Sequence, residues 1–273
     1  MIFLDEAFYK ILQLKGFSPR GYNGPGRYLD CFKDDVFIVS YPKSGNTWVR
    51  FIVANMLNLN EKVGFDNIEV FVPDVYINSN KSLLNMRRPR YLKSHEYFDP
   101  RMNKVIYITR DPMDVMVSLF FYLKKLGILS FNHSIDDFSE RMLQGEFDAK
   151  FGSWAENVGS WIGVDGASKD ILFLKYEDLI SNKRREFRRI SNYLNIDLSE
   201  EQLELVVYNS SFLNMKKSEN KNNNWKSCKE SNDEISFVRG GKTGEGRREL
   251  SLETIEKVSE LWGVQMQKLG YLP

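Results

Sequence analysis

The sequence is dominated by one repeated pattern, in which a short buried strand runs directly into a turn and then a helix. Val36–Ser40 is a β-rich apolar run, and Lys104–Thr109 is a second, followed by a helix from about Met113 to Lys125. Ile171–Leu174 is a third such strand. Strands that alternate with helices form a mostly parallel sheet covered on both faces. We therefore predict an α/β fold with a central, mostly parallel sheet flanked by helices.

The length, charge balance and apolar runs of the sequence limit the classes of protein to which it can belong. The 273 residues fit a single α/β domain spanning 1–273. Lys and Arg number 38 against 37 Asp and Glu, whereas a generic nucleic-acid binder has a basic excess, so we expect no nucleic-acid partner. No apolar run approaches the ~20 residues that span a bilayer, so we expect no membrane partner and a cytoplasmic enzyme. Cys31 and Cys228 read as free thiols of a reducing compartment.

The remaining segments are placed by their periodicity and composition. Residues 1–35 read as a short amphipathic N-terminal helix followed by a loop. Lys216–Glu234 is polar and rich in Asn and Lys, and a connection of that length inside a compact domain is usually functional or disordered. We favour a lid over residues 216–250, covering the site, rather than a linker. Further helices are expected at Ile135–Leu143, Trp154–Trp161, Arg184–Leu194 and Leu252–Lys268.

The strongest functional signal is the loop Tyr41–Trp48 (YPKSGNTW), between the first strand and its helix. Backbone N–H groups and the helix dipole attract an anion at such a position. Gly45 permits a tight turn, Lys43 supplies a charge, and Ser44 and Thr47 add hydroxyl donors. The loop is P-loop-like, but it is not a Walker A motif because its Lys precedes the Gly. A phosphate site is predicted here, with a plain turn carrying a surface lysine as the alternative.

Further candidate functional residues lie outside this loop. Arg110 begins the turn after the second strand, and Ser118 lies eight residues later on the following helix, so both can reach one phosphate. Taken alone, such an Arg is more often a salt-bridge partner. His95 follows a short strand, and an imidazole can act as a general base near neutrality, although a lone His is more often simply packed. His133 lies at a probable helix entry, where Ser134 is the expected N-cap.

Taken together, the motifs resemble those of the cytosolic-type sulfotransferases, in particular bacterial small-molecule enzymes. The likeness spans roughly residues 36 to 260, and its segments occur in the family's order. These segments are Tyr41–Trp48, Tyr91–Phe98, Val105–Tyr122, Leu174–Leu179, Ser210–Lys217 and Phe237–Gly246.

The resemblance implies a sulfotransferase that uses adenosine 3′-phosphate 5′-phosphosulfate (PAPS) and releases adenosine 3′,5′-bisphosphate (PAP). His95 would be the general base, and Lys43 would contact the 5′-phosphosulfate and stabilise charge on the bridging oxygen. The family also implies in-line transfer without a metal, and no metal site is expected. The other cofactor-binding positions that it implies are Ser44, Gly45, Asn46, Thr47 and Trp48 in the loop, Arg110 and Ser118 for the 3′-phosphate, Tyr176, Ser210 and Phe212 around adenine, and Arg239, Gly240 and Gly241 closing from the lid.

The sequence departs from the family pattern in places. Asn46 replaces a Thr, and we expect a small effect because its role there is mainly through the backbone. Gly240 replaces a Lys, for which Lys242 can substitute, and Gly246 replaces a Trp. The segment that mediates a dimer in the family is altered here at Arg247, Ser251, Leu252 and Glu256, so both a monomer and a homodimer stay open.

The acceptor pocket is expected to be aromatic, built from residues 71–76, 97–98 and 120–131 and the lid. This suits a small-molecule acceptor, a compact organic compound with a hydroxyl or amine. Acidic residues occur in or near these segments, so a cationic acceptor is possible: Asp74, Glu96, Asp136 and Asp137. Two other functions remain open: a P-loop nucleotide kinase, and a nucleotide-binding module that has lost catalysis.

Overall fold

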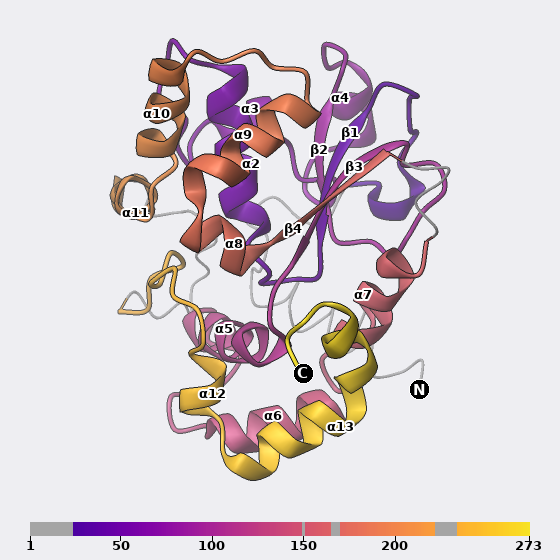
Figure 1. Ribbon diagram of the computed structural model, residues 1–273, viewed down its shortest axis with the longest axis vertical. Coiled ribbons are helices and arrows are strands. Elements are labelled where there is room, and N and C mark those ends of the chain that lie inside the picture. The colour runs from indigo at the N-terminus through magenta and orange to yellow at the C-terminus, as the bar shows by residue number, and fades with distance from the viewer. Residues whose placement is uncertain (1–23, 149–150, 165–169, 222–233) are drawn as a thin grey trace.

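The computed structural model describes residues 24–148, 151–164, 170–221 and 234–273 (Figure 1). Its described strands are β1 (Val36–Ser40), β2 (Tyr91–Ser94), β3 (Lys104–Thr109) and β4 (Asp170–Lys175), all parallel and in the order β2-β1-β3-β4. The predicted α/β fold with a parallel sheet is confirmed. The predicted N-terminal helix and Cys228 lie outside the described residues.

The helices predicted within the described residues are present, with ends that agree within two residues. Ser134 caps the helix at Ile135–Leu143 as expected, by accepting a hydrogen bond from the Asp137 N–H. The short helices η1, α3, α4, α8 and α12 and the longer helices α10 and α11 were not predicted. The described helices are η1 (Gly26–Tyr28), α2 (Asn46–Leu57), α3 (Ile68–Phe71), α4 (Asn80–Leu84), α5 (Pro112–Lys125), α6 (Ile135–Leu143), α7 (Trp154–Ile162), α8 (Tyr176–Ser181), α9 (Lys183–Tyr193), α10 (Glu200–Asn209), α11 (Phe212–Lys221), α12 (Gly246–Glu249) and α13 (Leu252–Lys268).

Helix α11 changes the picture of the polar stretch 216–234. The first six residues of this stretch, 216–221, belong to the helix that begins at Phe212, whereas the sequence suggested an irregular connection over the complete stretch. Met215, immediately before the polar stretch, lies on the buried side of this helix and provides an apolar contact with the core. Residues 222–233 lie outside the described part of the chain.

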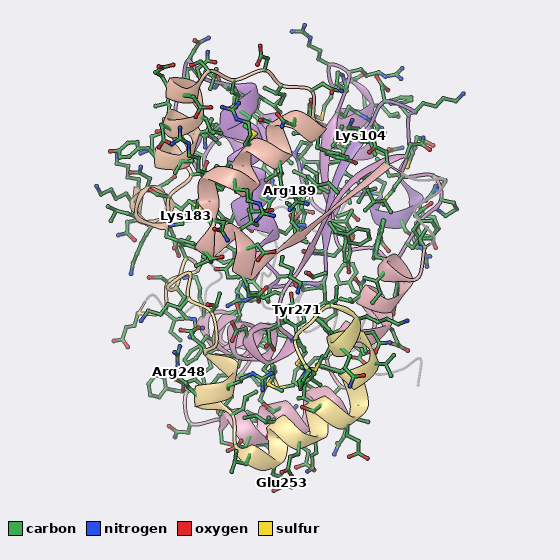
Figure 2. The ribbon with its side chains drawn as sticks, viewed as in Figure 1. Lys104, Lys183, Arg189, Arg248, Glu253 and Tyr271 are labelled. Atoms are coloured by element: carbon green, nitrogen blue, oxygen red, sulfur yellow. The ribbon has the colours of Figure 1, made fainter. Side chains whose placement is uncertain are left out.

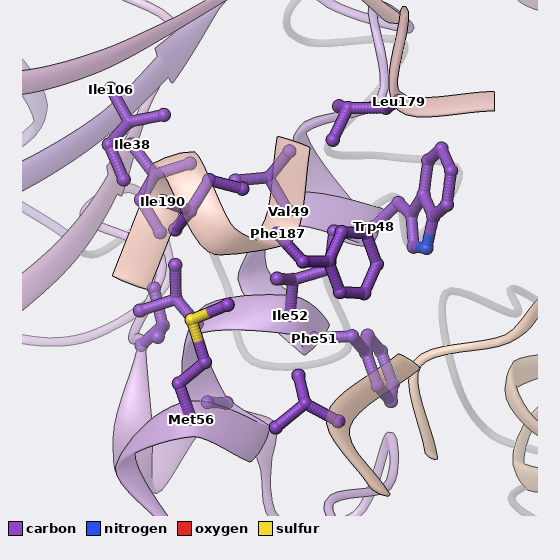
Figure 3. Packing of buried hydrophobic residues seen from close by; sticks show 14 of the residues in the cluster. Ile38, Trp48, Val49, Phe51, Ile52, Met56, Ile106, Leu179, Phe187 and Ile190 are labelled. Carbon is purple, nitrogen blue, oxygen red and sulfur yellow. The ribbon is translucent and has the colours of Figure 1, made fainter. Parts of the chain in front are cut away.

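The central strands β1 and β3 are buried on both faces, and alternate side chains of each strand point to opposite faces. Ile38 and Ile106 face the layer formed by α2, α8, α9 and α10, where Trp48, Val49 and Phe187 pack (Figure 3). Their neighbours along the strands, including Phe37 and Tyr107, pack on the other face against residues that include Trp161 of α7. The central strands therefore have little freedom to shift, and their carboxyl ends are held in place.

A second helical layer extends the fold below the sheet in Figure 1, where α13 packs against α5, α6 and α7. The C-terminal segment returns from it to the end of β3. There the hydroxyl of Tyr271 (labelled in Figure 2) donates to Glu177 at 3.1 Å and lies 3.3 Å from Thr109 Oγ1. None of the helices in the described ranges is long and apolar enough to cross a membrane.

A buried ion pair joins the start of β1 to the start of β2. The Asp35 carboxylate accepts hydrogen bonds from Arg90 Nε at 2.8 Å and from Nη2 at 2.5 Å, and both side chains are fully buried. The neighbouring pair, Asp34 with Arg88, is about half exposed. Two adjacent aspartates, Asp34 and Asp35, thus form ion pairs that differ in burial: the Asp35 pair is buried and the Asp34 pair is exposed.

Replacing Asp35 with Ala should lower the free energy of unfolding by about 3–5 kcal/mol, because it leaves the Arg90 guanidinium buried without its counterion. Urea denaturation of the purified protein measures the change. Asp34→Ala is the matched control and should change stability little, since water screens an exposed pair. Equal losses in the two variants would show that burial of the Asp35 pair carries no special weight.

Candidate active site

A cavity of about 260 Å³ opens where the carboxyl ends of the parallel strands meet. Ligands bind at this edge in open α/β sheets. Most of the residues predicted to bind the cofactor or to act in catalysis line it: Lys43, Gly45, Asn46, Thr47, Trp48, His95, Arg110, Ser118, Tyr176, Phe212, Arg239, Gly240 and Gly241. Ser44 and Ser210 do not line it, and both are fully buried.

The loop between β1 and α2 forms one wall of the cavity. Gly45 has φ +101°, and a Cβ there would lie 2.6 Å from the Tyr176 ring, so only glycine fits. Lys43 also has a positive φ, 68°, a conformation that non-glycine residues seldom adopt outside functional sites. Its Nζ lies 3.9 Å from the ring centroid of Tyr122 and 4.6 Å from that of Phe237. Aromatic faces thus hold the lysine charge inside the cavity.

Arg110 lies at the carboxyl end of β3 with its guanidinium 4.3 Å above the Tyr176 ring. Its Nη2 donates to the Lys242 carbonyl at 3.1 Å and is 3.5 Å from the Asp114 carboxylate. Its Nε is buried and makes no hydrogen bond to any described residue. Burial raises the pKa of Tyr176 to about 12, so the phenol beside Arg110 is neutral. The cationic groups Arg110, Arg239 and Lys242 share this end of the cavity, which fits a bound anion.

Ser210 is placed differently from the role that the family suggests. Its hydroxyl donates to the Phe51 carbonyl at 3.4 Å and accepts from Asn55 Nδ2 at 3.2 Å. Its carbonyl accepts a 2.8 Å hydrogen bond from the indole of Trp48. The Trp48 ring in turn lies 4.8 Å from that of Phe212. In this structure Ser210 therefore positions Trp48 instead of presenting its hydroxyl to the cavity.

His95 lies at the end of β2 with its ring orientation fixed. Nδ1 is 2.7 Å from the Ser40 carbonyl, and because a carbonyl can only accept, the neutral ring carries its proton on Nδ1 and its lone pair on Nε2. The ring stacks with Tyr76 and meets the edge of Phe151, with centroids 6.1 and 5.4 Å away. Burial raises the pKa of Tyr76, so its hydroxyl stays protonated and donates to Glu96 at 3.1 Å.

His133, the other histidine, does not line the cavity. Its Nε2 lies 2.7 Å from the Asp137 carboxylate, near the start of α6. His95 is therefore the one histidine of the sequence that the fold brings to the cavity.

Asn46 does more than the sequence suggested. We expected a role mainly through its backbone, but its side-chain amide nitrogen lies 3.1 Å from the Ile38 carbonyl and 3.2 Å from the Ser94 carbonyl. It also lies 3.3 Å from Ser40 Oγ. The amide thus ties the first turn of α2 to the ends of both β1 and β2, immediately before His95. A Thr side chain is too short to reach both strands.

The segment 237–246 contributes to the cavity lining and is held by three acidic residues that were not predicted from the sequence. Asp114 of α5 accepts from the N–H groups of Gly244 at 2.9 Å and Gly246 at 2.7 Å. Glu219 of α11 accepts from the Val238 N–H at 2.8 Å. Glu245 forms an ion pair with Arg239. Carboxylates that bind backbone N–H groups across the fold leave no pattern in the sequence.

The acceptor side of the cavity differs in part from the prediction. Asp74 lines it and forms a 2.9 Å ion pair with Lys93. Glu96 is buried against Tyr76, and Asp136 and Asp137 lie on α6, so none of these three lines the cavity. Asp148, which sequence reasoning missed, does line it. The aromatic character is as expected, with Tyr122, Phe147, Phe151 and Phe237 in the lining, whereas Tyr97 and Phe98 are not part of it.

The cavity combines a strand–loop–helix anion site with a histidine at its edge, which defines a group-transfer enzyme of the nucleotide-binding α/β class. A family model described as "Sulfotransferase domain" matches residues 33–270. Mouse sulfotransferase 2B1 is 31% identical over 270 residues, which cover 94% of this chain and 78% of that protein. The chain therefore belongs to the sulfotransferase family, and the predicted enzyme class, a PAPS-dependent sulfotransferase, is confirmed.

Solved structures show the same fold. A crystal structure of mouse sulfotransferase SULT7A1 complexed with PAP has a TM-score of 0.70 and 24% identity, covering 92% of this chain and 90% of that one. Retinol dehydratase in a complex with retinol and PAP has a TM-score of 0.72 and 23% identity, covering 93% and 85%. Within the described ranges, no cluster of three or more His, Cys, Asp or Glu side chains is arranged to hold a metal ion.

Asn46→Ala should reduce the free energy of unfolding by about 1–3 kcal/mol, since it removes the donor from two buried carbonyl groups. Guanidinium denaturation measures the loss. Asn58→Ala, at the exposed C-terminal end of the same helix, is the control and should change stability much less. If the two variants lose the same stability, the Asn46 side chain does not tie the helix to the strands.

Proposed function

We propose that the chain transfers the sulfuryl group of PAPS to a hydroxyl or amine of a small organic acceptor, with His95 as general base and Lys43 stabilising the leaving phosphate. The observation that carries the proposal is the convergence of His95, Lys43 and Arg110 on one cavity. Each comes from the end of a different parallel strand. No single segment of the sequence contains the site.

The residues present fit a donor with two anionic groups. Arg110 lines the cavity, and its Nε is a buried donor that no described residue satisfies, for which a phosphate oxygen is a suitable acceptor. Arg110, with Ser118 on α5, would hold the 3′-phosphate, while Lys43 and the N-terminus of α2 would face the 5′-phosphosulfate. Trp48, Tyr176 and Phe212 offer the aromatic surfaces on which adenine would stack.

When bound, the donor supplies an activated sulfuryl group. His95 Nε2 accepts the proton of the acceptor hydroxyl as its oxygen bonds to sulfur and the bond from sulfur to the bridging phosphate oxygen breaks. Proton transfer to Nε2 converts the ring into an imidazolium. The Ser40 carbonyl stabilises this cation, because it accepts the hydrogen bond from the Nδ1 proton and keeps the ring in place. The Lys43 ammonium balances the negative charge that grows on the bridging oxygen.

The cover of the site belongs to the same proposal. We assign the described residues 234–250 to a lid over the nucleotide end, with Arg239, Gly240 and Gly241 against the 3′-phosphate. Gly241 has φ +59°, and a Cβ there would lie 2.3 Å from the Phe212 ring, so this glycine lets the segment lie close to the adenine-stacking residue. The Arg110 hydrogen bond to the Lys242 carbonyl links the lid to the anion site.

His95→Ala should lower kcat by about 10²–10⁴-fold, since the acceptor proton then has no base, while PAP binding stays close to that of the wild type. Sulfation of a phenol panel, together with PAP titration calorimetry, measures both. His133→Ala is the matched control and should keep full activity. An active His95→Ala variant would remove His95 from the mechanism.

Lys43→Met should raise the transition-state free energy by about 2–4 kcal/mol, as the loss of an oxyanion donor does in other enzymes. Single-turnover rates with saturating PAPS isolate this effect from binding. A variant that loses donor affinity but keeps its rate would assign Lys43 to binding alone.

PAP at 100 times its Kd should stabilise the wild type by about 2.7 kcal/mol. Arg110→Ala should lose most of that stabilisation, because it removes a main partner of the 3′-phosphate. Thermal denaturation with PAP, ADP and AMP makes the comparison. Equal or greater stabilisation by ADP would favour a nucleotide kinase over the proposed donor.

A further inference from the structure

Three buried residues hold His95, each through a different polar atom. The His95 N–H donates to the Tyr76 hydroxyl at 2.9 Å, and Nδ1 donates to the Ser40 carbonyl at 2.7 Å. The His95 carbonyl accepts a 3.1 Å hydrogen bond from the side-chain amide of Asn157. Asn157 is a residue of helix α7. The position of His95 therefore depends on this helix as well as on the strands.

The amide of Asn157 also holds the aromatic neighbour of the imidazole. Its Nδ2 lies 3.3 Å from the Phe151 carbonyl, in addition to its contact with His95. The rings of Phe151 and His95 have centroids 5.4 Å apart and meet edge to face. One amide group is thus bonded to the backbone of both members of this ring pair.

The orientation of the Asn157 amide follows from its partners. Carbonyl groups can only accept, so Nδ2 faces the carbonyls of His95 and Phe151, and Oδ1 faces the Tyr107 hydroxyl at 3.1 Å. Burial raises the pKa of Tyr107, so this hydroxyl keeps its proton and donates it to Oδ1. Asn157 and Tyr107 are fully buried and do not line the cavity. They hold the wall behind His95 and do not meet a ligand themselves.

We propose that Asn157 is a positioning residue for the base: its bonds to the backbone of His95 and Phe151 keep the imidazole turned with Nδ1 on Ser40. The inference rests on the proposed function, in which His95 Nε2 takes the acceptor proton. Without Asn157 the His95 carbonyl loses its donor, and the ring can rotate away from Ser40. A displacement of about 1 Å at a reacting group can cost about 10²-fold in rate.

Asn157→Leu removes the amide with little change in side-chain volume. Its kcat for sulfation of a phenol should fall about 10–100-fold, while titration calorimetry should give the wild-type affinity for PAP. Asn67→Leu is the control, because the Asn67 amide bonds only within its own loop, to Lys62 and Gly64, and this variant should keep its kcat. Losses of kcat and PAP affinity by the same factor in Asn157→Leu would show a general loosening of the fold and overturn the inference.

Nitrogen-15 NMR of the imidazoles reads the position of the ring without turnover. The sequence has two histidines, so His133→Gln assigns the signals of His95. The wild-type ring should carry its proton on Nδ1, and Asn157→Leu should convert it to a mixture with the Nε2-protonated form. That change in a protein that sulfates no acceptor would support the positioning and refute the proposed function. An unchanged imidazole in Asn157→Leu would overturn the inference, even in an active enzyme.

Asn157→Asp is a second variant, which keeps the shape of the side chain. Burial favours the neutral carboxyl at about pH 6, where it can donate to the His95 carbonyl, whereas the ionised form at about pH 8.5 cannot. The kcat relative to wild type at the same pH should therefore fall as pH rises, with circular dichroism confirming the fold at both values. Among the titratable neighbours, Tyr107 stays neutral, Glu156 is bound to Ser153, and the comparison with wild type cancels the titration of His95. A ratio that stays constant or rises with pH would count against donation by residue 157.

Discussion

Parallel pairing of β1 with both β2 and β3 is the constraint on which the site depends. It places three strand ends at one edge of the sheet, and from them come the anion-binding loop, His95 and Arg110. The register is fixed because both faces of the central strands are tightly packed, so a shift by one residue would exchange the side chains of the two layers and disrupt the packing of both. The relative positions of His95, Arg110 and the loop 41–48 are thus set by the hydrophobic core that holds the strands.

Much of this arrangement could be predicted because its signals are local. A buried strand followed by a glycine-containing loop and an amphipathic helix can be read directly, and the loop residues 41–48 and Arg110 followed from it. Helix α10 could also have been found, since Ser199 and Gln202 form a capping box. The first turns of α11 are harder to read, because a helix with few apolar residues resembles a polar loop in sequence.

The rest depended on contacts between distant segments. Asn46 looked like a backbone residue because nothing in the sequence places the carbonyls of Ile38 and Ser94 beside its amide. Asp114 and Glu219 bind backbone N–H groups more than a dozen residues away, an interaction that no residue pattern announces. Asp148 was not predicted to line the cavity for the same reason. Composition suggested Asp136 and Asp137 for the acceptor pocket, but these residues of α6 do not line the cavity.

The Asn46 amide also joins one wall of the cavity to the sheet. Its hydrogen bonds fasten the loop 41–48 to the ends of β1 and β2. The opposite wall, residues 237–246, is joined to other parts of the fold: its backbone is hydrogen-bonded to the side chains of Asp114, Glu219 and Arg110, and Val238 packs into the core beside α2. The two walls are therefore anchored independently, one to the strands and the other chiefly to the helices α5 and α11.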